Sequence, residues 1–121
     1  MTATFSYCIN LDYIDLTGWN TIKLTSINAA FEYCHKLKKI YGIENINVSL
    51  CTSFSTLFTE NFCLTDLDLL NWNTEKITHL GSTFSWCISL KNLNISNWDT
   101  SKVTSFNSTF YGCWALKELD L

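Results

Sequence analysis

Apolar residues recur along the chain at a regular interval. Phenylalanines mark this interval, and their spacing is constant except that the second gap is longer by a single residue. Each unit also carries a Leu-x-x-Leu-x-Leu pattern, as at Leu90, Leu93 and Ile95, and its second half alternates like a strand with one buried face. A unit this short cannot bury its apolar side alone, so neighbouring units must cover it. The phenylalanines are Phe5, Phe31, Phe58, Phe84 and Phe110.

The rest of each unit predicts a turn and a short helical piece. Residues rich in Asn, Asp, Ser and Thr follow the strand, and they are typical of turns. Val103, Phe106 and Phe110 are then spaced three and four apart, as on the inner face of a helical turn. The interval also falls within the roughly 20–29 residues of a leucine-rich repeat. The units therefore predict a repeat solenoid: a leucine-rich-repeat-like right-handed coil with one parallel β-sheet and short helical or 3-10 segments on the opposite side.

The whole chain, residues 1–121, is predicted to be a single domain with units starting near residues 5, 31, 58, 84 and 110. It opens and stops within a unit, so we expect a fragment or an uncapped array. The second unit has one extra residue near Tyr41 and Gly42, which predicts a bulge, and Ile46 stands where other units have tryptophan. In the third unit Asn61 stands where other units have cysteine.

Three segments resemble the BspA-like bacterial surface-protein repeats, a leucine-rich-repeat variant: LNISNWDTSKVT at 93–104, FYGC at 110–113 and IYGIEN at 40–45. The resemblance implies protein–protein recognition or adhesion, and a location at the cell surface or in the secreted fraction. That family usually carries methionine where this chain has Phe106 and Thr109. The Phe106 position is apolar in every unit, whereas the Thr109 position is partly polar, so its burial is open.

Two sets of columns are interpreted as packing. Tryptophans at Trp19, Trp72 and Trp98 are expected to cover the edge of the core and not to form a sugar-binding ladder, since Ile46 shares their column. The leucine columns are expected to form the core. These columns contain Leu11, Leu37, Leu64, Leu90 and Leu116, and then Ile14, Ile40, Leu67, Leu93 and Leu119.

Four cysteines also share a column: Cys8, Cys34, Cys87 and Cys113. Ligands strung along a stack give poor tetrahedral geometry, so no zinc site is predicted. Adjacent units could bring Cys8 near Cys34, or Cys87 near Cys113, at a disulfide distance. Buried free thiols are favoured over those disulfides, because free cysteine is among the most buried residue types. Neither a metal nor another cofactor is expected.

The outward residues of the predicted strands are the candidate binding site, because repeat arrays commonly bind along such a face. An acidic face with tyrosines suits a basic or mixed protein ligand. The alternative is that these polar residues only solvate the sheet. The residues are Tyr13, Asp15, Lys39, Tyr41, Asp66, Asp68, Asn92, Asn94, Glu118 and Asp120.

Other function classes find little support in the chain. The formal net charge of −3 argues against nucleic acid as a partner. No apolar run reaches the length of a membrane span, so membrane insertion is not expected, and no signal peptide follows Met1. His35 and His79 are isolated and no catalytic constellation stands out, so no enzyme is expected. The prediction is a non-enzymatic recognition or adhesion module that binds a protein. The alternative is a scaffold component of a coat, fibre or envelope whose neighbouring copies associate end to end.

Overall fold

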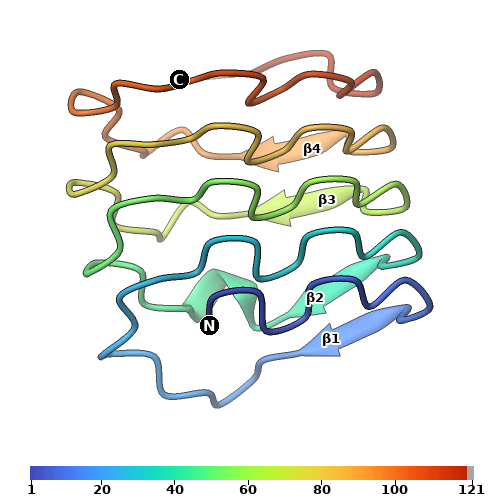
Figure 1. Ribbon diagram of the computed structural model, residues 1–121, viewed down its shortest axis with the longest axis horizontal. Coiled ribbons are helices and arrows are strands. Elements are labelled where there is room, and N and C mark those ends of the chain that lie inside the picture. Colours follow the sequence, from blue (N-terminus) through green and yellow to red (C-terminus); the bar gives the residue numbers. More distant parts are fainter. Residues whose placement is uncertain (120–121) are drawn as a thin grey trace.

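The computed structural model describes residues 1–119 as short strands, turns and one 3-10 helix. Successive repeat units lie one above another, with the labelled strands in a column on one side (Figure 1). We call these units layers 1 to 5 and identify them by Phe5, Phe31, Phe58, Phe84 and Phe110. The elements are β1 (Tyr13–Asp15), β2 (Lys39–Tyr41), η1 (Ile43–Asn45), β3 (Asp66–Asp68) and β4 (Asn92–Asn94).

The strands form two separate sheets. β1 pairs with β2 in parallel, with Ile14 opposite Ile40, and β3 pairs with β4 in parallel, with Leu67 opposite Leu93. Within residues 1–119 no backbone hydrogen bond joins β2 to β3. The predicted leucine-rich-repeat-like coil with one continuous parallel sheet is therefore wrong. The chain is a small domain of short strands and turns, with two two-stranded sheets.

The extra residue in the second unit coincides with the break between the sheets. Gly42 has a left-handed φ of 79° and starts η1 immediately after β2, instead of forming the predicted bulge. The indole N–H of Trp72 then donates to the carbonyl oxygen of Ile43 at 2.9 Å. The chain leaving β2 is thus held in a 3-10 turn, while in the other layers it continues without a helix.

The side opposite the strands consists of turns, so the predicted helical segments there are wrong as well. In layer 1 the amides of Ser6 and Cys8 donate to Ala3 and Phe5 in two successive tight turns. Ala3 and Tyr7 have positive φ, and the same two positions are left-handed in the later layers. Alternate amides donate to the next layer: Phe5 N–H, for example, donates to the Ala30 carbonyl at 2.8 Å. The backbone of this side therefore pairs between layers and not within a helix.

A column of phenylalanine rings forms the centre of the core. Neighbouring rings are 5.4–5.7 Å apart and within 8° of parallel. The three middle rings are fully buried, whereas Phe5 and Phe110 at the two ends are partly exposed. The core prediction from the leucine columns is confirmed in the middle layers except at Leu93, which is partly buried, and it is wrong for Leu11, which is 37% exposed.

The tryptophan column also packs, with one exception. Trp72 and Trp98 are buried with parallel rings, and the Trp98 indole donates to the carbonyl oxygen of Leu69 at 3.1 Å. Trp19 is 45% exposed, so the packing prediction is wrong in layer 1. In the neighbouring polar column, Thr83 and Thr109 are buried. Each threonine hydroxyl lies within hydrogen-bond distance of two backbone carbonyl oxygens, so the question of their burial is resolved.

The cysteine column stabilises the layers through hydrogen bonds. The thiols of Cys34, Cys87 and Cys113 each donate to the carbonyl oxygen of the phenylalanine one layer earlier, at 3.0–3.1 Å. Asn61 replaces the thiol in layer 3, and its amide donates to the Phe31 carbonyl at 2.8 Å. All six cysteines are free thiols, but of the four in the column only Cys34 and Cys87 are buried as predicted, and Cys8 and Cys113 are partly buried.

These thiols should differ sharply in reactivity. Burial raises the pKa of Cys34 to about 11 and also raises the pKa of Cys87, whereas Cys63 is exposed. A thiol with pKa 11 holds about 100-fold less thiolate than one at the ordinary value of 9.0, and thiolate is the nucleophile. Iodoacetamide at about pH 8 should therefore alkylate Cys63 first, with Cys34 and Cys87 reacting only after denaturant is added. Peptide mass spectrometry would check this order, and equal labelling of Cys87 and Cys63 in the native protein would contradict it.

Candidate functional site

The strand side chains that point outward form the candidate site. On β1, β2 and β3 the middle residue is buried and the two flanking residues are exposed. β4 is covered less well, and Leu93 is only partly buried. We call the outward residues the strand face. The strand face comprises Tyr13, Asp15, Lys39, Tyr41, Asp66, Asp68, Asn92 and Asn94.

The part of the strand face on β1 and β2 is aromatic. The rings of Tyr13 and Tyr41 are 6.2 Å apart, and the two side chains are 52% and 45% exposed. The Lys39 ammonium lies 5.4 Å from the centre of the Tyr41 ring, within the range of a cation–π contact. Asp15 accepts a hydrogen bond from the Thr17 amide at 2.9 Å, and hydrogen bonding from Thr17 lowers the pKa of Asp15.

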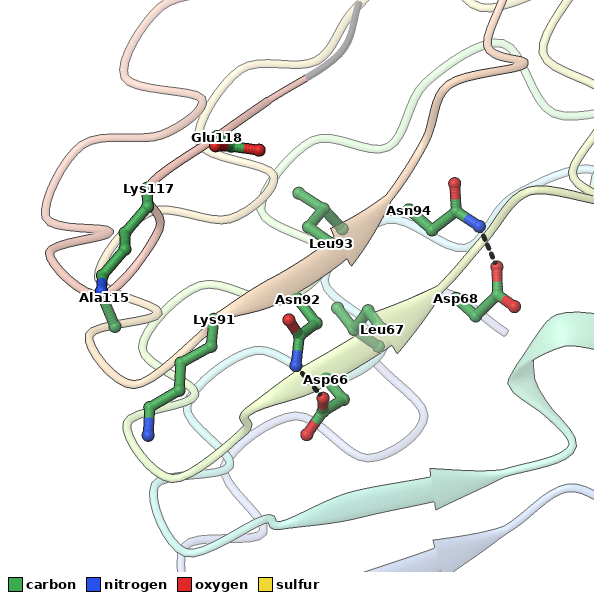
Figure 2. A pocket seen from close by; sticks show the side chains of 10 residues that line it. All are labelled: Asp66, Leu67, Asp68, Lys91, Asn92, Leu93, Asn94, Ala115, Lys117 and Glu118. Carbon is green, nitrogen blue, oxygen red and sulfur yellow. Dashed lines mark hydrogen bonds between the residues drawn. The ribbon is translucent and has the colours of Figure 1, made fainter.

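The part of the strand face on β3 and β4 holds two oriented carboxylates. Asn92 Nδ2 donates to Asp66 Oδ1 at 2.5 Å, and Asn94 Nδ2 donates to Asp68 Oδ1 at 2.9 Å (Figure 2). Thr65 also donates its hydroxyl to Asp66. The hydrogen bond from Thr65, followed by that from Asn92, holds the pKa of Asp66 below its ordinary value of 3.8. Asp66 therefore remains charged at neutral and mildly acidic pH.

A pocket of about 850 Å³ lies between these two strands and residues 115–118. The chain at 115–118 makes no strand pairing with β4 among the described residues, and this leaves Leu93 partly uncovered. Figure 2 shows Lys117 and Glu118 on the far side of the pocket from Asp66 and Asp68. Glu118 is thus exposed as predicted, but it lies on an unpaired segment, and Asp120 lies outside the described residues.

A family model described as "Mycoplasma protein of unknown function, DUF285" matches residues 1–120. The chain belongs to the DUF285 family. The resemblance to BspA-like repeats, which rests on three short segments, is therefore wrong as a family assignment. No curated protein and no solved structure matches this DUF285 chain.

The chemistry available to this DUF285 chain at the strand face is binding by charge and hydrogen bonds. Within residues 1–119, no group of three His, Cys, Asp or Glu side chains could hold a metal ion. The same residues contain no helix long and apolar enough to cross a membrane. Carboxylates, amides and tyrosines are instead displayed together and held by neighbours, which suits contact with a polar surface.

Sequence reasoning missed three residues of the pocket: Lys91, Ala115 and Lys117. The two lysines occupy equivalent positions in successive units and precede the outward residues Asn92 and Glu118. That spacing was a usable signal, because equivalent positions in adjacent units lie side by side. With these lysines the pocket carries charges of both signs.

Proposed function

We propose that this DUF285 chain is a non-enzymatic module that recognises or adheres to a protein ligand at a microbial cell surface. The observation that supports the proposal is the row of outward side chains on β1 to β4, most of them exposed, with carboxylates held by hydrogen bonds. Asp66 and Asp68 are held by Asn92 and Asn94, so little side-chain entropy remains to be lost on binding. Tyrosine is a residue that interfaces favour, and Tyr13 and Tyr41 are exposed on β1 and β2 of the same strand face.

The ligand that fits this face is a protein segment rich in lysine or arginine, with some acidic groups. Asp66 and Asp68 would receive the basic side chains, since complementary charge gives specificity to an interface. Lys39, Lys91 and Lys117 would meet the acidic groups and would repel a purely basic polymer. Binding should weaken with salt, because the participating charges are exposed.

An array of short peptides of graded net charge would test the proposal. We expect the full chain to retain mainly basic and mixed peptides. The double variant Asp66→Asn/Asp68→Asn should bind these peptides with about tenfold lower affinity. These substitutions remove charge but keep the shape of both side chains. Glu75→Gln/Asp99→Asn is the matched control, because it removes two exposed carboxylates outside the strand face. Retention that is independent of peptide charge, or an equal loss in both double variants, would refute the proposal.

The second candidate is a scaffold component that associates end to end. It is favoured by a specific observation at the outer faces of layers 1 and 5, where rows of backbone hydrogen-bonding groups are unpaired among the described residues. Such rows are templates for pairing with another chain.

A further inference from the structure

One hydrogen-bond register joins every pair of adjacent layers on the turn side. The amides of Ala3, Phe5 and Tyr7 each donate, at 2.8–2.9 Å, to the carbonyl that immediately precedes the equivalent residue of layer 2. Between layers 4 and 5, Phe84 N–H donates to the Thr109 carbonyl at 3.0 Å with the same offset. The register also spans layers 2 and 3, where the strands do not pair. This ladder is therefore a backbone contact that every pair of adjacent layers shares.

The two outer faces carry the unused halves of the ladder. On layer 5 the N–H groups of Ser108, Phe110 and Gly112 have no partner within residues 1–119. On layer 1 the carbonyl groups of Thr2, Thr4 and Ser6 likewise have none among those residues. The first set consists only of donors and the second only of acceptors. Both sets have the alternate-residue spacing of the internal ladder, so the faces are complementary to each other and not to themselves.

We propose that a second copy of this chain docks its layer 1 on layer 5 of the first and continues the internal register. Ser108 N–H would donate to the Thr2 carbonyl of the other copy, Phe110 N–H to Thr4 and Gly112 N–H to Ser6. Buried backbone groups are strongly driven to find partners, so the register would fix the docking geometry.

The side chains on the two faces match in the same register. Phe110 and Phe5 end the phenylalanine column and are partly exposed, so they would stack on each other across the contact. Phe106 is 44% exposed, although the equivalent Leu80 and Phe54 are buried under the next layer. The hydroxyl of exposed Thr4 would meet the Phe106 carbonyl, because Thr109 contacts the Leu80 carbonyl with the same spacing.

The contact joins two different faces, so it does not close on itself. Heterologous contacts of this kind lead to open chains of molecules. The docking is independent of ligand binding by the strand face, and neither Thr4 nor Phe106 belongs to that face. The docking of layer 1 on layer 5 supplies the contact between copies that a scaffold function would need.

Sedimentation velocity of the full chain at rising concentration tests the docking. The wild-type chain should form a concentration-dependent series of oligomers. Phe106→Lys blocks one face and Thr4→Lys blocks the other, and each variant alone should be monomeric. An equimolar mixture of the two has one intact face of each kind and should give a dimer of twice the monomer mass, and nothing larger.

The matched control is Leu50→Lys. Leu50 is 41% exposed on an inner layer, and the equivalent positions in later units carry Lys76 and Lys102. This variant should associate like the wild-type chain, and thermal melts should show that all three variants are folded. A monomeric wild-type chain at the highest soluble concentration would overturn the proposal. Folded single variants that still associate, or a mixture that remains monomeric, would also overturn it.

Discussion

Replacing Phe58 by alanine is expected to lower the free energy of unfolding by about 3–5 kcal/mol. Phe58 is fully buried, and its ring stacks on Phe31 at 5.4 Å and on Phe84 at 5.7 Å. Truncation would remove both ring contacts and leave a cavity at the centre of the column. Neighbouring layers cannot collapse into it, because the backbone ladder holds them at a constant separation.

Urea denaturation followed by tryptophan fluorescence would measure this loss, and Phe110→Ala is the control. Phe110 is partly exposed and, among the described residues, stacks on Phe84 alone, so its truncation should cost about 1–2 kcal/mol. If both variants lost the same free energy, the central position of Phe58 in the core would be contradicted. The comparison must be made at low protein concentration, where the proposed end-to-end docking does not contribute.

The apolar pattern predicted the middle of the core correctly because each middle layer has, on both sides, another layer with the same apolar pattern. Leu64, Leu67 and Trp72 are buried as expected. In layer 1, which has a described layer on one side only, Leu11 and Trp19 occupy the same columns but are exposed, while Ile14 and Leu16 are buried. Burial in a stack depends on what lies on both sides, and that information is not contained in the unit itself.

The turn side could not be predicted from the spacing of its apolar residues. A separation of three and four residues is typical of a helix, but successive tight turns produce the same separation. What distinguishes them is the left-handed backbone at two positions per unit. Those positions hold residues such as Ala29, Tyr33 and Trp86, which seldom adopt positive φ. The structure stabilises this conformation through the ladder between layers, so no local sequence preference reveals it.

The outward residues of the strand face followed from simple alternation, and this part of the candidate site was predictable. The pocket was not, because it exists only where residues 115–118 fail to pair with β4. Sequence repetition predicts that adjacent strands pair, and the repeated residues do not indicate where that pairing fails. The extra residue near Gly42 was visible, but its consequence, a 3-10 turn that separates two sheets, was not.

Gly42→Ala is expected to lower the free energy of unfolding by about 3 kcal/mol, because two costs add. The φ of +79° is strained for any residue with a Cβ, and an added Cβ would lie 2.8 Å from the Thr17 backbone nitrogen. Since Thr17 follows β1, relief of this overlap requires layers 1 and 2 to separate, which weakens the pairing of β1 with β2.

Gly18→Ala separates the two costs. Gly18 has nearly the same φ, +78°, but nothing lies within 4 Å of its added Cβ. This variant should therefore lose only the conformational term, about 1 kcal/mol. Urea denaturation of both variants gives the difference, which measures how closely the backbone after β2 approaches layer 1. Equal losses would show that the approach of Gly42 to Thr17 is relieved without cost.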